Sequence, residues 1–501
     1  MASIFLTLFA GAVALLCFYL YLRFTYWKRN GIPTARGCYP IVGHVLPVLS
    51  NKKSFNDMVQ EIYNEYPDCS MVGIYRTIRP ALIIRDPNLV KTVMQSNFSN
   101  FHTNGLHIEA DADPLFAKNP FFSEGEVWST ERKRLTYAFS SSKLKSLFVT
   151  VTGVCEKFKN YLNRRLSSND KYEVELKYLF SKFTGEVVAN AALGIEGRCF
   201  EDKDDPNAFD QIGHSFFKPT KLEKFFSQCI FLLPELNHLL KIRFVPKQLD
   251  QLFRKIVEKN MEIRRKEPAP RNDFLQLMID LEKTGEALDL EAVTAHAFSF
   301  YADGFETSST TLSFIGYQLA THQDVQDRLR NEVKTVIEKH GGALTYEGLK
   351  EMTYMDQVIN ESQRCYVALT ILNKECSESF VLEGSDGLRC HVKPGTQILI
   401  PIQALQLDPK YWPDPQNFDP ERFSEERKGG IKKYTFLPFG EGPRMCVGMR
   451  MALMQMKACL ATLLKDHKIE LSPKTKLPLN VTSIFFFLSP IGGLWVNISK
   501  L

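Results

Sequence analysis

A cysteine near the C-terminal end of the chain stands in a sequence that suits a metal ligand. Residues 436–448 read F-L-P-F-G-E-G-P-R-M-C-V-G, with Cys446 close to the end of the run. The glycines and the proline before it predict an irregular loop whose backbone N–H groups can face the sulfur, and a helical pattern begins just after it. Hydrogen bonds from such amides and the positive end of a helix favour the thiolate that a metal-ligating cysteine needs. Arg444 places a cation nearby in the sequence.

A second polar cluster interrupts the longest predicted helix, which spans roughly residues 290–339. Residues 303–311 read D-G-F-E-T-S-S-T-T, and glycine followed by an acid and hydroxyls is a poor filling for a helix core. Residues that oppose the secondary-structure preference of their own segment in this way tend to mark functional sites. The alternative is a polar stripe that faces solvent. These residues alone do not distinguish a functional site from such a stripe.

The cysteine loop resembles the haem-binding loop of the cytochrome P450 family of haem-thiolate monooxygenases. The family pattern F-x-x-G-x-R-x-C-x-G is matched at every fixed position, by Phe439, Gly442, Arg444, Cys446 and Gly448. The resemblance implies a haem b cofactor, iron protoporphyrin IX, with Cys446 as the axial ligand of the iron. In that role the thiolate donates electron density that helps cleave the O–O bond of dioxygen. A buried cysteine in a glycine-rich turn is the alternative.

Other segments follow in the order that the family implies. Glu361 and Arg364 resemble its E-x-x-R helix, and Arg422 resembles the arginine that completes a structural Glu-Arg-Arg network behind the haem. Trp128 and Arg132 resemble its W-x-x-x-R helix, in which the indole and guanidinium hold a haem propionate.

The mid-helix cluster resembles the oxygen-activating segment of the family. Gly304 is expected to open a groove beside the iron, while Glu306 and Thr307 stabilise water and deliver protons. Two positions depart from the family pattern. Lys374 stands where a propionate-binding arginine is common. Lysine keeps the positive charge but lacks the forked guanidinium that donates two parallel hydrogen bonds. Asp303 replaces a small apolar residue.

The elements that position these residues are predicted to be mostly helical. Residues 71–75 and 81–84 are β-branched runs typical of strands, and most of the remainder has helical periodicity. The fold class is therefore expected to be mainly α with small β-sheets. The resemblance implies that this is the cytochrome P450 fold, preceded by one N-terminal transmembrane helix. The expected division is an anchor at residues 1–22, a tether at 23–50 and a haem-thiolate monooxygenase domain at 51–501.

The N-terminal segment predicts a membrane anchor. Residues 2–22 are uncharged and long enough to span a bilayer, and Arg23, Lys28 and Arg29 follow them. The positive-inside rule then leaves the catalytic domain cytosolic. The resemblance to microsomal members implies a single-pass anchor in the endoplasmic reticulum membrane. A cleaved signal peptide is the alternative, but the apolar run is long and no basic region precedes it.

The substrate is expected to be a lipophilic small molecule such as a xenobiotic, insecticide or hormone-like lipid, because the overall sequence most resembles microsomal insect members. Residues 225–233 are apolar with basic flanks, which indicates either a contact with membrane lipid or core packing. By resemblance, the candidate pocket residues are apolar and aromatic for the most part: Leu106, His107, Phe216, Phe217, Ala302, Leu369 and Phe486.

Electrons must come from a separate protein, because no G-x-G-x-x-G loop or flavin domain accompanies the haem motif. The family implies an NADPH-dependent flavoprotein reductase, with cytochrome b5 as a further candidate. A basic docking face for an acidic reductase is expected from residues flanking the cysteine side: Lys133, Arg134, Lys143, Lys145, Lys432, Lys433 and Arg450.

Composition excludes several other classes of protein. The 501 residues are 44% hydrophobic with a net charge of only +5, which gives no basis for nucleic-acid binding. Hydrolase motifs such as G-x-S-x-G and H-E-x-x-H are absent from the sequence. Two alternatives stay open: a haem-thiolate isomerase or dehydratase of lipid peroxides, and a non-catalytic haem-containing carrier of lipophilic compounds.

Overall fold

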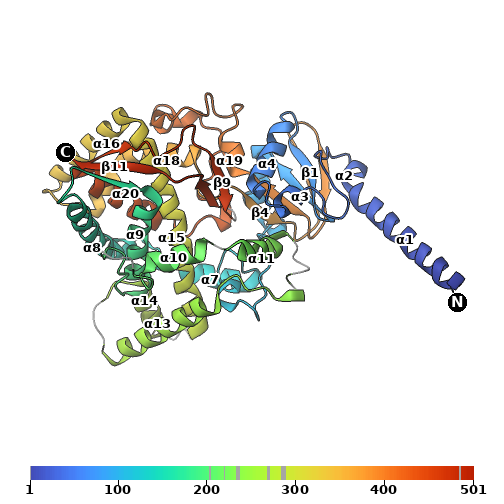
Figure 1. The fold of residues 1–501 in the computed structure, drawn as a ribbon, viewed down its shortest axis with the longest axis horizontal. Coiled ribbons are helices and arrows are strands. Elements are labelled where there is room, and N and C mark those ends of the chain that lie inside the picture. The colour runs from blue at the N-terminus through green and yellow to red at the C-terminus, as the bar shows by residue number, and fades with distance from the viewer. Residues whose placement is uncertain are drawn as a thin grey trace.

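The structure is a computed structural model that describes the chain except residues 1, 202–204, 219, 233–236, 238, 268–270, 284–288 and 485–486, and except the side chains of residues 2, 221, 224, 227, 229 and 484. A helical body carries small sheets, and one helix projects from it (Figure 1). The main helices of the body are α4 (Phe55–Glu65), α7 (Gly125–Ala138), α8 (Ser141–Arg165), α9 (Leu176–Val188), α10 (Phe209–Phe217), α11 (Lys221–Leu232), α13 (Lys247–Lys266), α14 (Phe274–Lys283), α15 (Leu290–Thr321), α16 (Gln323–Lys339), α18 (Thr353–Cys365) and α20 (Met449–Asp466). The shorter helices are α2 (Tyr26–Arg29), α3 (Leu46–Leu49), α5 (Pro87–Lys91), α6 (Pro114–Ala117), α17 (Tyr346–Glu351) and α19 (Ile402–Gln406).

In the part of the chain that the structure describes, four small sheets accompany the helices. The largest has the order β1 (Met71–Arg76), β2 (Arg79–Ile84), β7 (Gln397–Ile400), β4 (Leu372–Glu375). The two predicted N-terminal strands are confirmed as an antiparallel pair, with Met71 opposite Ile84. The remaining sheets are β3 (Lys171–Glu175) with β11 (Trp495–Lys500) and β8 (His467–Leu471), β5 (Phe380–Glu383) with β6 (Arg389–Val392), and β9 (Val481–Ile484) with β10 (Phe487–Pro490).

Helix α15 runs through the middle of the body (Figure 1). The prediction of one helix across residues 290–339 was wrong in one respect, because the chain turns at His322, whose ψ of 81° is not helical, and restarts as α16. Buried residues of α15 up to Phe305 pack in one hydrophobic cluster, and those from Leu312 onward pack in another. The polar segment between Phe305 and Leu312 belongs to neither hydrophobic cluster, so its side chains are available to line a cavity.

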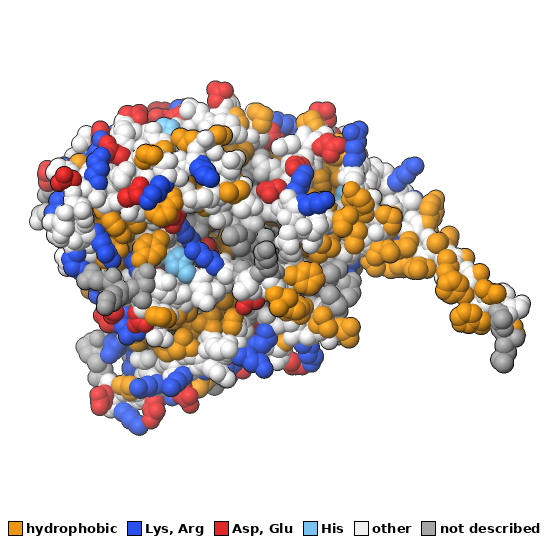
Figure 2. Space-filling view, in the orientation of Figure 1, with side chains coloured by type: hydrophobic (Ala, Val, Ile, Leu, Met, Phe, Trp, Pro, Cys, Tyr) orange, Lys and Arg blue, Asp and Glu red, His pale blue; other side chains and the backbone are white. Residues whose placement is uncertain are grey.

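The projecting helix is α1 (Ala2–Phe24), and its apolar side chains are exposed along its length (Figure 2). Among the described residues it alone is long and apolar enough to cross a membrane. The segment that follows packs on the body. Trp27 is fully buried against Gly73 of β1 and donates from Nε1 to the carbonyl oxygen of Ile74 at 2.8 Å.

Candidate active site

The sequence-predicted chemistry converges on one cavity of about 330 Å³. Helix α15 forms one wall through Ala302, Asp303, Gly304 and Thr307, and the loop before α20 forms another through Cys446. Most of the remaining wall is apolar. Two motifs separated by some 140 residues of sequence therefore face a common space, although each was identified from local pattern alone.

The cysteine loop holds its sulfur toward this cavity. The backbone N–H of Cys446 donates to the carbonyl oxygen of Phe439 at 2.8 Å, which closes the loop. Gly442 has a φ of +72°, and a Cβ there would collide with the carbonyl oxygen of Met94. Only glycine both adopts this positive φ readily and has no Cβ to collide with that oxygen. A Cβ on Gly448 would lie 4.0 Å from the Cys446 sulfur, so its absence keeps space around the sulfur open.

The Cys446 side chain is exposed to the cavity rather than to the protein surface. Burial raises the pKa of its thiol to about 11, and the backbone N–H groups of Gly448 and Met449 act in the opposite direction. Arg132 is a nearby cation that also favours the thiolate. A metal ion deprotonates a coordinating thiol outright, so an iron ion held by Cys446 would supply the positive charge that stabilises the thiolate.

Three cations lie around the same cavity, namely Arg132, Lys374 and Arg444. Arg444 donates to the carbonyl oxygens of His102, Pro120 and Ser123, and its guanidinium lies 4.5 Å from the Trp128 ring centre. Lys374 donates to Asn104 Oδ1 at 2.9 Å.

Within the described part of the chain, none of these three cations forms a hydrogen bond with a carboxylate. Burial lowers the pKa of Lys374 to about 7 and that of Arg444 to about 10. A planar apolar group with anionic substituents fits this arrangement, because its ring would meet the apolar wall and its carboxylates would neutralise the cations. Haem is such a group, and a thiol facing the ring completes the donor set.

Neighbouring residues of α15 point in different directions. Gly304 and Thr307 line the cavity, and the Thr307 hydroxyl donates to the carbonyl oxygen of Asp303. Glu306 does not line it. Its Oε1 lies 3.0 Å from Lys177 Nζ on α9, so the acid is turned toward the neighbouring helix. The structure therefore separates two residues that sequence analysis assigned to one proton-delivery pair.

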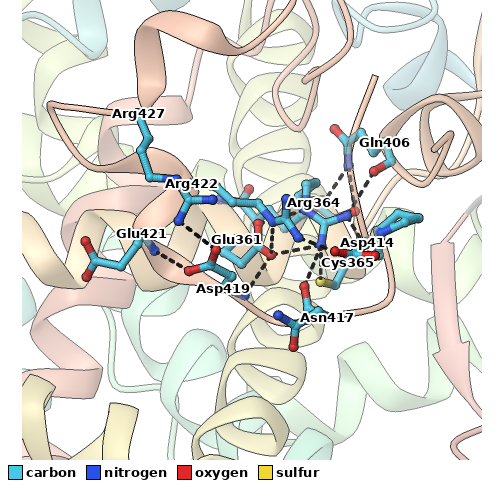
Figure 3. A network of polar contacts seen from close by, with 12 residues as sticks. Glu361, Arg364, Cys365, Gln406, Asp414, Asn417, Asp419, Glu421, Arg422 and Arg427 are labelled. Carbon is cyan, nitrogen blue, oxygen red and sulfur yellow. Dashed lines mark hydrogen bonds and ion pairs between the residues drawn. The ribbon is translucent and has the colours of Figure 1, made fainter. Parts of the chain in front are cut away.

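A buried ionic network lies behind the cysteine loop (Figure 3). Arg364 forms a forked contact with Glu361, at 2.7 Å to Oε2 and 2.8 Å to Oε1, and Arg422 reaches the same carboxylate at 3.3 Å. Glu361 and Arg364 are fully buried. Two cations against one anion leave a positive excess, which backbone carbonyl oxygens of Gln406, Pro415 and Asp414 offset.

Gln406 is a residue that sequence analysis missed. Its side chain donates to the carbonyl oxygen of Gln363 at 2.8 Å and accepts from the N–H of Leu437 at 2.9 Å. It therefore joins the network to the start of the cysteine loop. No sequence signal marks it, because a single glutamine gains this role only from tertiary contacts.

The candidate pocket residues lie in different surroundings. Phe217, Ala302 and Leu369 line the cavity, whereas Leu106 lines a smaller neighbouring pocket. Phe216 packs among other phenylalanines, and His107 is half exposed near Glu124 and Glu375. Phe486 lies outside the described residues.

The apolar stretch at residues 225–233 is divided by the structure. Phe225 and Phe226 are exposed, as is Leu222 one turn earlier, whereas Phe231 and Leu232 are buried beside the pockets. Of the expected basic flank, Lys241 pairs with Asp111 and Arg243 with Asp250. The stretch thus combines surface exposure and core packing.

Comparison with known proteins agrees with this geometry. Residues 33–495 match the family model described as Cytochrome P450. The chain is 34% identical to Cytochrome P450 6a2 of Drosophila melanogaster, over 98% of both chains. It is 33% identical to Cytochrome P450 6j1 of Blattella germanica, over 99% of this chain and 98% of that one, and 33% identical to Cytochrome P450 9e2 of the same insect, over 95% and 94%. A sulfur aimed across an apolar, cation-rimmed cavity and a match along almost the whole sequence together place this chain in the cytochrome P450 family of haem-containing monooxygenases.

Proposed function

We propose that this protein is a membrane-bound haem-thiolate monooxygenase that inserts one oxygen atom of O2 into a lipophilic small molecule, such as a xenobiotic, an insecticide or a hormone-like lipid. The observation that carries the proposal is that Cys446 lines the same largely apolar cavity as Gly304 and Thr307. An apolar cavity with few polar groups suits lipophilic ligands.

Cys446 is the proposed axial ligand of the haem iron. Phe439, Gly442 and Gly448 shape the loop that presents it, while Trp128, Arg132, Lys374 and Arg444 hold the propionates. Glu361, Arg364 and Arg422 stiffen the chain behind the loop. When bound, the haem supplies binding and reductive activation of dioxygen.

Proton delivery is the proposed task of α15. Gly304 has no side chain and therefore leaves space beside the helix at the cavity wall. The Thr307 hydroxyl can hold a water molecule and pass its proton. Glu306 contributes through its ion pair with Lys177, which fixes the position of α15 against α9.

The proposed division is an anchor at residues 1–22, a tether at 23–50 and a catalytic domain at 51–501, with the enzyme on the cytosolic face of the endoplasmic reticulum. The exposed apolar length of α1 supports this proposal. Membrane lipid is then the environment from which a lipophilic substrate enters.

Electrons are proposed to come from NADPH through a separate flavoprotein reductase, with cytochrome b5 as a second donor. Lys133, Lys432, Lys433 and Arg450 are exposed, Lys143 is half-buried, and all five supply positive charge for an acidic partner. Lys145 and Arg134 contact Glu347 and Glu131. A reductase affinity that does not change with salt would contradict this docking mode.

The proposal predicts a spectroscopic difference between two cysteine variants. Reduced wild-type protein with carbon monoxide should give the strongly red-shifted Soret band of thiolate-ligated haem, and Cys446→Ala should lack it. Cys459→Ala is the matched control, because Cys459 is fully buried in α20 away from the cavity wall, and this variant should keep the band. A haem-loaded Cys446→Ala protein with an unchanged band would overturn the assignment.

A further inference from the structure

Asp303 is the only acidic side chain among the described residues that line the cavity. It stands on the wall formed by α15, between the small residues Ala302 and Gly304. Its side chain is accessible from the cavity that it lines, and burial within the protein raises the pKa of its carboxyl group. A carboxyl group therefore projects into an otherwise apolar cavity, where an unpaired charge is costly.

Asn119 holds this carboxyl group in place. Its Nδ2 donates to Asp303 Oδ2 at 3.1 Å, while its own Oδ1 accepts from the backbone N–H of Phe121 at 2.7 Å. The second contact orients the amide so that its donor faces the acid. Oδ1 of Asp303 has no hydrogen bond within the described part of the chain, so this oxygen is left toward the cavity.

A cation is missing from the described surroundings of Asp303. Burial raises the pKa of its carboxyl group to about 6, and only the hydrogen bond from Asn119 acts against this rise. Lys374 lies near Asn104 and Arg444 near Trp128, where the propionates are proposed to sit, and neither they nor Arg132 is among the groups that shift the pKa of Asp303. Asp303 is thus ionised near neutral pH without a protein counter-ion.

The wall near Asn119 is aromatic. Phe116 stacks on Phe122 with ring centres 4.7 Å apart and on Phe244 at 4.9 Å. These rings line the same cavity as Asp303. They offer an apolar body of a ligand a large contact surface, and aromatic faces also attract cations.

We propose that Asp303 is a specificity-determining residue that binds the protonated nitrogen of a lipophilic amine, whose apolar part packs on the phenylalanines beside Asn119. This inference rests on the proposed monooxygenase function and names the substrate class that the site selects. The ammonium group donates to Oδ1 and neutralises the buried carboxylate, so the charge of each group stabilises the other. Neutral lipophilic compounds gain the aromatic contact alone.

The test compares two ligands of the same shape in the haem-loaded, full-length protein. The probes are dimethyl(phenylbutyl)amine, which is protonated at neutral pH, and its uncharged isostere, in which a CH group replaces the nitrogen. Dissociation constants come from spectral titration of the haem without reductase or NADPH. Asp303→Asn should weaken amine binding by about 10-fold or more, which corresponds to about 1.4 kcal/mol. Binding of the isostere should change by less than about twofold.

Glu291→Gln is the matched control, because it removes an acid from the same helix outside the cavity, and it should change neither affinity. The carbon monoxide spectrum of each variant reports haem ligation, so loss of the thiolate band would contradict the proposed function rather than the amine site. Equal amine affinity for wild type and Asp303→Asn, with the band intact, would refute the amine site and leave the monooxygenase proposal standing. An Asp303→Asn variant that binds both ligands more weakly by the same factor would also refute the amine site.

Discussion

At the scale of single residues, Glu306 and Thr307 differ in what their side chains touch. Thr307 faces the cavity, whereas Glu306 contacts Lys177, whose Nζ also donates to Ser309 Oγ at 2.7 Å and Thr310 Oγ1 at 2.8 Å. Burial lowers the pKa of Lys177, and Glu306 counteracts that effect. Adjacent positions of one motif can therefore serve catalysis and stability separately.

Substitutions at these two positions should have separable effects. Glu306→Gln leaves the partly buried Lys177 without this ion pair, and we expect it to reduce the free energy of unfolding by about 1–3 kcal/mol. Thr307→Ala should leave stability nearly unchanged and lower the amount of product formed per NADPH consumed, because the hydroxyl that holds the proton-donating water is lost. Thermal unfolding and coupled turnover measure the two effects.

Thr307→Ser is the control at the second position, since it keeps the hydroxyl and should restore most of the coupling. A Glu306→Gln protein of unchanged stability that nevertheless wastes NADPH would return Glu306 to the proton path.

At the scale of elements, the sequence predicted those features that depend on residues lying close together in the chain. The strands β1 and β2, the loop before Cys446 and the start of α20 follow from residue types within a few positions of one another. The direction of Glu306, the bridge through Gln406 and the break at His322 depend on packing between distant segments. Asp303 was visible as a departure from the family pattern, but its isolation in the cavity appeared only with the fold.

The contact between residues 23–50 and β1 predicts a pH dependence. His44 is buried; its Nδ1 accepts from the N–H of Tyr75 at 2.9 Å, and its Nε2 lies 2.9 Å from the carbonyl oxygen of Ala35. Burial lowers its pKa below the usual 6.5. The unfolded chain then binds a proton at higher pH than the folded one, so the free energy of unfolding falls as pH drops from about 6.5 toward the lowered value.

His44→Gln cannot titrate and should show a smaller loss of melting temperature between about pH 8 and about pH 5.5 than wild type. His391→Gln, at an exposed position of β6, serves as the control and should behave as wild type. An identical pH profile for His44→Gln and wild type would show that protonation of this ring does not weaken the contact with β1.

At the scale of the whole molecule, the surface proposed to contact the membrane extends beyond α1. Exposed apolar residues also occur on the body, at Tyr39, Ile41, Leu222, Phe225 and Phe226. Helix α11 connects this surface to the interior, since Arg76 of β1 donates to the carbonyl oxygen of Phe231 and that residue lines both pockets. A lipophilic substrate leaving the bilayer near α11 would thus meet the cavity wall directly.

The position at which the anchor is removed should decide whether the body survives. A chain lacking residues 2–24 keeps Trp27 on Gly73, so it should fold and still bind liposomes through the exposed side chains of α11. Removing residues 2–29 also deletes the fully buried Trp27, which should cost about 3–5 kcal/mol of stability. Thermal unfolding of both truncated proteins and liposome sedimentation of the first measure these outcomes.

Adding the substitutions Leu222→Ser, Phe225→Ser and Phe226→Ser to the shorter deletion separates the second membrane contact from the anchor. These side chains are exposed, so the fold should be unaffected while sedimentation with liposomes is lost. The same substitutions at the exposed Val127, Tyr137 and Val149, on α7 and α8, control for the loss of surface hydrophobicity and should leave binding intact. If the anchor-free protein with unmodified α11 already fails to sediment, α1 is the sole attachment, and entry of substrate from the bilayer near α11 is excluded.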